Sequence, residues 1–235
     1  MKLKDIKEIK GKILIKTGLH IGAGNDEIKI GGVDNPIIKN PLTNEPYIPG
    51  SSLKGKIRSL IEWQFGLSSD GEPVDVQKNS SNIAKKVAKL FGNGKTIKDD
   101  KLASEIGPSR VSFADCSLEN KEELLEKNAL IEEKVEVRID RLSGTVGRGG
   151  PRHMERVPAG ANFEFSITLL EFENDENLEK ILALGMKLLE LTNLGGSGSR
   201  GYGKIEFEIE KGLDSKFLNG KRLKSYEELK NMVGN

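Results

Sequence analysis

Cysteine and histidine are nearly absent from this sequence of 235 residues. Cys116 is the single cysteine, so no disulfide can form within the chain and no zinc site can rest on paired thiolates. The two histidines, His20 and His153, lie far apart and lack the close spacing that zinc-binding histidines share. These absences exclude a disulfide-stapled scaffold and a zinc module of the Cys/His kind.

A large net charge and a long apolar run are missing as well. The chain holds 37 Lys and Arg against 36 Asp and Glu, and a net charge of +1 does not by itself indicate a nucleic-acid binder. No segment has the length and apolar character of a membrane span or a signal peptide. We therefore expect a cytoplasmic protein without a membrane partner. Its 36% hydrophobic and 31% charged residues are typical of a globular chain.

Periodicity predicts an α+β chain. Strands are expected over about 9–21, 110–116, 162–172 and 205–209, and helices over about 51–66, 82–91, 120–129 and 177–193. A glycine-containing basic hairpin is expected over 134–157. Without the intervening segments the order reads βαββαβ, which is the ferredoxin-like (RRM-like) order. We expect a single domain, 1–235, with a core of about 6–21, 51–66, 109–116 and 161–210, and insertions at 22–50, 67–108 and 117–160.

Arginine is concentrated in the expected hairpin. Five of the nine arginines fall within nineteen residues: Arg138, Arg141, Arg148, Arg152 and Arg156. Only Asp140 and Glu155 offset them there, so the window carries a charge of about +3. The guanidinium fork suits phosphate and stacks on bases, which favours nucleic acid as the ligand. The alternative is a set of Arg–carboxylate pairs with Asp140 and Glu155.

A second candidate segment is the loop GSGSRGYGK, residues 196–204, with glycines at Gly196, Gly198, Gly201 and Gly203. Glycine lets a ligand approach the backbone, so the loop can direct several N–H groups at a phosphate, with Arg200 beside them. It lies between a helix and a strand and lacks the ending of a P-loop. A flexible helix-to-strand turn is the alternative.

The loop over residues 22–50 and the helix after it hold the remaining candidates. Asp34 follows two glycines and precedes Asn35-Pro36, and this composition alone favours an Asx-turn former over a catalyst. Ser51 or Ser52 is expected to cap the helix, with Lys54 on the next turn, which gives either a phosphate site or a simply capped helix. His20 could contact phosphate or transfer a proton, but no neighbouring acid in the sequence orients it.

Three stretches together resemble a known family. HIGAGNDEIKIGGVDNPIIKNPLTNEPYIPGSSLKGKIRSLIE, IDRLSGTVGRGGPRHMERVPAG and LGGSGSRGYGKI are similar, in this order, to the N-terminal signature, the thumb and the glycine-rich loop of RAMP-type backbone subunits of type III-A (Csm) CRISPR complexes. The similarity covers most of the chain, although 67–108 and the tail beyond residue 211 carry little of it.

The resemblance implies a filament of several copies along the CRISPR RNA, together with other Csm subunits, and cleavage of the bound single-stranded target RNA. It implies that Asp34 is catalytic and helps to hold Mg²⁺ or Mn²⁺ only when RNA is bound, which reverses the preference from local sequence. The implied RNA-binding residues are His20, Ser51, Ser52, Lys54, Arg58, Arg138, Arg141, Arg148, Arg152, Arg156, Gly196, Gly198, Arg200 and Gly201.

Three other functions stay open at this point. A RAMP subunit that only binds RNA would use Asp34 to shape its loop. A guide-processing endoribonuclease would cut without metal and use His20 as a general base. A nucleotide-binding regulator would rest on the glycine-rich loop alone.

Overall fold

The computed structural model describes residues 1–24, 34–68, 70–148 and 150–234. Its strands are β1 (Leu3–Ile15), β2 (Val111–Phe113), β3 (Glu132–Glu136), β4 (Arg152–Arg156), β5 (Asn162–Phe172), β6 (Ile205–Lys211), β7 (Leu218–Asn219) and β8 (Arg222–Leu223). Its α-helices are α1 (Gly50–Gln64), α2 (Asn82–Phe91), α3 (Asp100–Ile106), α4 (Lys121–Glu126), α5 (Leu178–Leu191) and α6 (Tyr226–Val233). Short 3₁₀ turns are η2 (Gly198–Arg200) and η3 (Ser215–Phe217).

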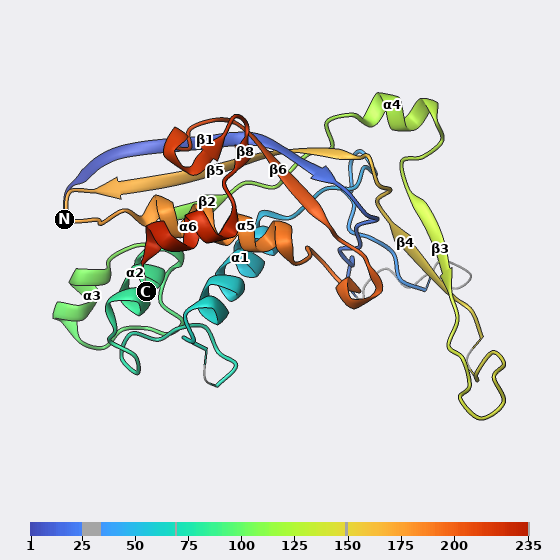
Figure 1. The fold of residues 1–235 in the computed structure, drawn as a ribbon, viewed down its shortest axis with the longest axis horizontal. Helices are drawn as coiled ribbons and strands as arrows, with labels where there is room; N and C mark the ends of the chain where they lie inside the picture. Colours follow the sequence, from blue (N-terminus) through green and yellow to red (C-terminus); the bar gives the residue numbers. More distant parts are fainter. Residues whose placement is uncertain (25–33, 69, 149, 235) are drawn as a thin grey trace.

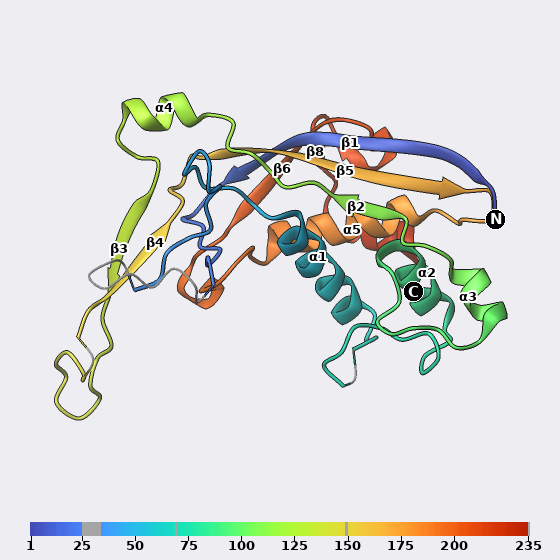
Figure 2. The same cartoon turned by 180° about the vertical axis from the view of Figure 1, so that it is seen from behind.

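Four strands form the main sheet in the order β2-β5-β1-β6, and every neighbouring pair is antiparallel. The β1–β5 ladder is the longest and runs from Leu3 opposite Phe172 to Leu14 opposite Asn162. The helices α1 and α5 lie along one face of this sheet (Figures 1 and 2). The α+β class expected from the sequence is confirmed.

The helix-facing side of the sheet and the inner faces of α1 and α5 make the core. The side chains at alternate positions of β1, such as Ile9 and Ile13, are fully buried. The two helices approach closely at Gly185, where an added Cβ would lie 2.5 Å from Cδ1 of Ile61 and 2.7 Å from Cγ2 of Ile57. The glycine at position 185 of α5 is therefore what allows α1 to pack so near.

The first strand differs from its expected range of 9–21. It begins at Leu3 and ends at Ile15, because the chain bends after Ile15 and the N–H groups of Lys16 and Thr17 both donate to the carbonyl of Lys204. His20 consequently lies in a connection beyond the strand rather than on its outer face. The expected strand over 110–116 is also shorter, since only Val111–Phe113 pairs with β5.

The start of α1 corrects another expectation. Pro49 is the N-cap residue and no side chain caps the helix, so Ser51 and Ser52 lie within the first turn. The carboxylate of Asp115 accepts a hydrogen bond from the Gly50 N–H at 2.8 Å and so occupies part of the helix N-terminus. With φ −59° and ψ 133°, Pro49 is extended, so the chain enters the helix from an extended segment.

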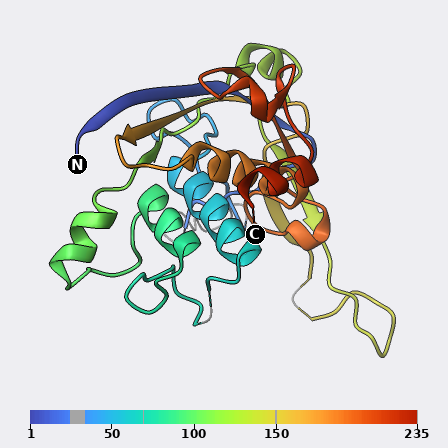
Figure 3. The same ribbon diagram turned by 60° about the vertical axis from the view of Figure 1, so that its left-hand side comes forward.

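The segment 67–108 folds against the far end of α1 and contains α2 and α3 (Figure 3). The predicted helix over 82–91 is confirmed, with Ser81 as its cap. Glu62 anchors the segment: it is 5% exposed, and it accepts hydrogen bonds from the Val74 N–H at 3.0 Å and from Nε of Arg58 at 2.7 Å. The four-residue spacing of Lys54, Arg58 and Glu62 therefore marks a partly covered face of α1.

The basic hairpin expected over 134–157 is present and is shifted slightly. Strands β3 and β4 pair antiparallel from Glu132 opposite Arg156 to Glu136 opposite Arg152, and the arm projects well beyond the sheet (Figure 1). We call residues 132–156 the thumb hairpin. The charged helix expected over 120–129 precedes it and is shorter, as α4.

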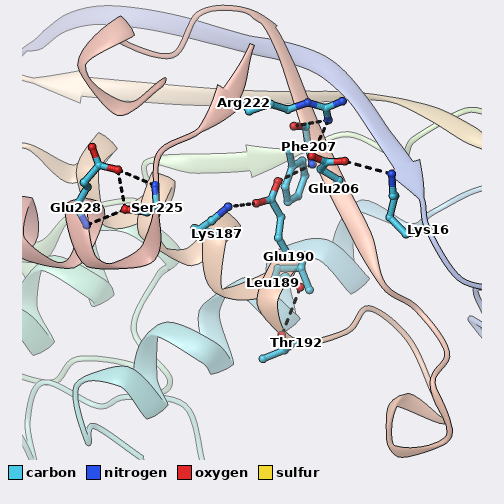
Figure 4. Close-up of polar contacts among 10 residues, drawn as sticks. All are labelled: Lys16, Lys187, Leu189, Glu190, Thr192, Glu206, Phe207, Arg222, Ser225 and Glu228. Atoms are coloured by element: carbon cyan, nitrogen blue, oxygen red, sulfur yellow. Dashed lines mark hydrogen bonds and ion pairs between the residues drawn. The ribbon is translucent and has the colours of Figure 1, made fainter. Parts of the chain in front are cut away.

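Elements beyond residue 211, which the sequence left unassigned, close one edge of the sheet. Strand β6 is an edge strand, and Figure 4 shows how its backbone is occupied at Phe207. The carboxylate of Glu190 accepts the Phe207 N–H at 2.8 Å, and Arg222 donates to the Phe207 carbonyl at 3.2 Å. Filled backbone groups discourage pairing with another strand. No helix in the described part of the chain is long and apolar enough to cross a membrane.

Candidate nucleic-acid interface

Asp34 lies at the base of the thumb hairpin. Its side chain is exposed, and Oδ2 accepts a hydrogen bond from the backbone N–H of His153 at 2.9 Å. The next residue, Asn35, forms a bridge parallel to Met154 of β4. The segment that carries Asp34 therefore runs along β4 like a short additional strand. Residues 25–33 of the expected insertion 22–50 lie outside the described residues.

Glu155 joins this segment to the rest of the site. Its carboxylate accepts the Ile37 N–H at 3.1 Å and pairs with Lys39 at 2.9 Å, and both partners of that ion pair are largely buried. Its backbone carbonyl lies 2.7 Å from Nδ1 of His20. A carbonyl oxygen can only accept, so Nδ1 of His20 carries a proton. Glu155 thus fixes both the loop of Asp34 and the ring of His20, and it is not the partner of an arginine as one reading of the sequence proposed.

His20 also contacts the glycine-rich loop. The N–H of Gly196 donates to the His20 carbonyl at 2.9 Å, and a Cβ on Gly195 would lie 2.3 Å from the same oxygen. Gly198 begins the turn η2, and a Cβ there would lie 2.2 Å from Cγ of Asn193. Close packing thus constrains Gly195 and Gly198, and Gly201 adopts a positive φ of 84°, whereas a Cβ on Gly196 would meet no atom nearer than 3.6 Å. The structure brings the loop, His20 and the thumb hairpin together at one end of the sheet.

The predicted residues of α1 form a separate group. Ser51 is exposed and Ser52 is half-buried in the first turn. Partial burial, and secondarily the charge of Arg58, lowers the pKa of Lys54. Nη2 of Arg58 is buried and has no hydrogen-bond partner among the described residues. Arg58 is already paired with Glu62 at 2.7 Å, so Lys54 supplies the uncompensated positive charge of this group, toward which an anion would be attracted.

Of the thumb arginines, Arg156 is the one with a fixed position. It pairs with Glu132 of β3, and its guanidinium lies 5.0 Å from the ring centre of Tyr202. Gly18 leaves room for it, since a Cβ there would lie 2.5 Å from the arginine side chain. Arg156 therefore serves the attachment of the hairpin to the glycine-rich loop.

The remaining thumb arginines are exposed: Arg138, Arg141, Arg148 and Arg152. Asp140, which the sequence offered as a possible partner, instead accepts from the N–H groups of Leu142 and Ser143 and closes its own turn. Hydrogen bonds from the Ser143 and Leu142 N–H groups stabilise the ionised carboxylate and so lower the pKa of Asp140. The alternative reading of the cluster, Arg–carboxylate pairs with Asp140 and Glu155, is thus not seen among the described residues.

Tyr202 is the residue whose importance the sequence did not indicate. Its ring is fully buried between the hairpin and the loop, with Nζ of Lys134 at 4.6 Å from the ring centre on β3. Its hydroxyl donates to Oε1 of Glu136 at 2.7 Å, and Arg200 pairs with Oε2 of the same carboxylate at 2.7 Å. Tyr202 and Arg200 therefore hold the hairpin and the glycine-rich loop together through Glu136.

Among the side chains that the structure describes, a divalent ion would find only part of its ligands. Among residues 1–24, 34–68, 70–148 and 150–234, no three His, Cys, Asp or Glu side chains come together as a metal site. Asp34 offers one exposed carboxylate. Mg²⁺ commonly takes one or two carboxylates and completes its shell with phosphates and water. The residues fit an ion that is shared with RNA and do not fit a protein-only metal centre.

Comparison with known proteins agrees with this arrangement. The sequence matches the RAMP superfamily over residues 12–206. It is 41% identical over 213 residues to the CRISPR system Cms endoribonuclease Csm3 of Methanothermobacter thermautotrophicus, covering 85% of this chain and 82% of the relative. It is 40% identical over 207 residues to the protein of the same name from Streptococcus thermophilus, with 86% of each covered.

Solved structures give the same picture. A chain in the crystal structure of the Csm3-Csm4 subcomplex of the type III-A CRISPR-Cas interference complex matches with a TM-score of 0.53 and 31% identity, over 89% of this chain and 79% of that chain. The Methanopyrus kandleri Csm3 crystal structure matches in fold, with a TM-score of 0.56 and 24% identity over 88% and 76% of the two chains. The chain therefore belongs to the RAMP superfamily and, within it, to the family of the Csm3 proteins.

Proposed function

We propose that this chain is the backbone subunit of a type III-A CRISPR effector complex, that it binds the CRISPR RNA, and that it cuts the paired target RNA. Its partners are then CRISPR RNA, single-stranded target RNA, further copies of itself and other Csm subunits. The relatives named as endoribonucleases support the activity, and the Csm3-Csm4 subcomplex supports the assembly. A cytoplasmic location remains an expectation from the sequence.

We also infer the finer description of the fold. The sheet order β2-β5-β1-β6 with antiparallel neighbours, and helices α1 and α5 on one face, support a ferredoxin-like core. On this view residues 1–235 form one RAMP domain, and the insertions 22–50, 67–108 and 117–160 supply the Asp34 loop, a lid-like helical segment and the thumb hairpin.

One observation supports the assignment of cleavage most strongly, namely the attachment of Asp34 to β4. The hydrogen bond from the His153 N–H places an exposed carboxylate beside a projecting hairpin that carries exposed arginines. A strand held across that hairpin would meet the carboxylate at a fixed point. Such positioning can remove a large part of a reaction barrier.

In the reaction we propose, the 2′-oxygen of the target attacks the adjacent phosphorus and the bond to the 5′-oxygen breaks. The products are a 2′,3′-cyclic phosphate and a 5′-hydroxyl. Asp34 would accept the proton of the attacking hydroxyl or hold Mg²⁺ or Mn²⁺ together with RNA phosphates. When bound, such an ion would stabilise negative charge on the phosphate.

The test uses the assembled complex with matched target RNA, with and without Mg²⁺. Asp34→Ala is expected to slow cleavage at least about 100-fold, as loss of a general base or sole carboxylate ligand does, with guide binding nearly unchanged. Asp70→Ala removes an exposed carboxylate that pairs with Lys78 at 2.6 Å and lies outside the thumb and the glycine-rich loop, and it serves as the matched control. Normal cleavage by the Asp34 variant would remove the catalytic assignment.

The same assay separates the other candidate functions. Guide binding without metal-dependent cutting in the unaltered complex would indicate a RAMP subunit that only binds RNA. Metal-independent cutting of precursor guide that His20→Ala abolishes would indicate a guide-processing enzyme.

A further inference from the structure

A groove of about 430 Å³ lies between the thumb hairpin and the glycine-rich loop. It is lined by Glu136, Val137, Arg138, Arg152 and Arg200. Two arginines of the hairpin and one of the loop thus line the same groove as a single carboxylate, which pairs with Arg200. The lining carries three positive charges and one negative charge, so an anion that entered would meet a net attraction.

Glu136 is the most firmly held residue of this groove. Its side chain is 17% exposed, and it takes the Tyr202 hydroxyl at Oε1 and Arg200 at Oε2, each at 2.7 Å. Nζ of Lys134 lies farther away, 3.6 Å from Oε1. The Tyr202 hydrogen bond, followed by the charges of Arg200 and Lys134, lowers the pKa of the Glu136 carboxyl. The carboxylate is therefore ionised at neutral pH and stays in place.

Arg200 is held much less firmly. Its side chain is 58% exposed, and its ion pair with Glu136 is the single one it makes among the described residues. A guanidinium fork binds phosphate with the geometry it uses for a carboxylate. Exposed ion pairs contribute little stability, so exchange of one anion for another on Arg200 is inexpensive.

We propose that the Glu136 carboxylate holds the place of an RNA backbone phosphate in this groove, and that RNA binding transfers Arg200 from Glu136 to that phosphate. The proposal rests on the proposed RNA-binding function. It adds that Glu136 competes with an RNA phosphate for Arg200. After the transfer Tyr202 still donates to Glu136, so the hairpin remains attached to the loop. Arg138 and Arg152 lie on the same wall to contact the entering strand.

The experiment measures affinity of the full chain for a fluorescently labelled single-stranded RNA over a range of salt concentrations. Glu136→Gln keeps the shape of the side chain and removes its charge. It is expected to tighten binding about three- to tenfold at low salt and to steepen the salt dependence, because Arg200 becomes available to a phosphate. In the background of Arg200→Gln the same change is expected to have an effect below about twofold.

Tyr202→Phe is the matched control, because it loosens the hold on Glu136 without removing the charge that pairs with Arg200. Its affinity for RNA should stay within about twofold of the unaltered chain. Equal tightening by Tyr202→Phe would show that a loosened hairpin causes the effect, and would overturn the proposal. Weaker binding by Glu136→Gln would overturn it too, because Glu136 would then orient Arg200 for the ligand.

The proposal can fail while the proposed function stands. If the combined change of Arg138, Arg152 and Arg200 to Gln leaves RNA affinity unchanged, the groove does not bind RNA and Glu136 competes with nothing there. Cleavage that depends on Asp34 would still support the enzyme assignment in that case.

Discussion

The core and the thumb hairpin differ in how far their apolar side chains are exposed to solvent. In the core, alternate residues of β1, β5 and β6 are buried against α1 and α5. In the hairpin and its connecting segment, large apolar side chains are about half exposed or more: Val135, Val137, Ile139, Leu142 and Val146. Exposed apolar side chains grouped on a projecting arm are typical of a surface that meets a ligand.

This difference in exposure predicts which replacements change the free energy of unfolding and which change RNA binding. Side chains of the core contribute to the free energy of unfolding, because their burial removes apolar surface from water. Side chains at the tip of the hairpin contact little of the chain itself. Their replacement should therefore alter RNA binding and leave unfolding nearly unchanged, and each prediction below can break that division.

The largest expected effect on folding is at the contact between α1 and α5. Gly185→Val would place its Cβ 2.5 Å from Ile61, in a core that has no room for it. We expect the free energy of unfolding in urea to fall by about 1–3 kcal/mol, the range for overpacking. RNA affinity of the folded fraction should not change, and a loss of affinity larger than the unfolded fraction explains would break the division.

Gly55, on the partner helix α1, provides the matched control. An added Cβ there meets no atom within 4 Å, and the residue lies on the exposed side of α1. Gly55→Ala should raise the free energy of unfolding by about 0.5–1 kcal/mol, because alanine loses less backbone entropy in a helix. A decrease would show that this side of α1 is covered in the folded chain.

Replacements at the hairpin tip are expected to change RNA binding and not the stability of the fold. Arg141→Gln combined with Arg148→Gln should reduce the slope of log affinity against log salt by about 0.7 for each lost phosphate contact. The urea midpoint should stay where it is, since both side chains are exposed. Lys101→Gln, which removes an exposed cation on α3, is the control for charge alone. An unchanged salt slope would remove these arginines from the RNA surface.

Much of the core could be predicted because period and burial coincide there. The strand over 162–172 and the helix over 177–193 agree with β5 and α5 to within two residues at each end. The limits of β1 were predicted less well, because the alternation of Thr17, Leu19 and Ile21 continues past the bend. Tertiary hydrogen bonds to Lys204 end the strand, and such contacts leave no mark in local sequence.

The sequence predicted which residues form the site, but it did not predict the contacts between them. The three quoted motifs brought in Asp34, the thumb arginines and the glycine-rich loop, and the structure places these three groups at one end of the sheet. Pairings across long sequence distances were not accessible, such as Glu155 with Lys39, or Asp115 with the start of α1. Tyr202 lay inside a noted motif, yet only its contacts with Glu136 and Lys134 show that it joins the hairpin to the glycine-rich loop.

Tyr202 lies between the hairpin and the glycine-rich loop. The smallest expected effect is on the ionisation of its phenol. Burial, followed by the hydrogen bond and charge of Glu136, raises the pKa of its phenol to about 12. A pKa raised by folding contributes stability that is complete below about pH 10, the unfolded value, and is lost as pH rises through the folded one. An alkaline titration of phenolate absorbance should therefore show one late-ionising tyrosine that Tyr202→Phe removes. If that ionisation occurs instead near pH 10, then water reaches the Tyr202 hydroxyl, and the hairpin is attached less firmly than its contacts with the core indicate.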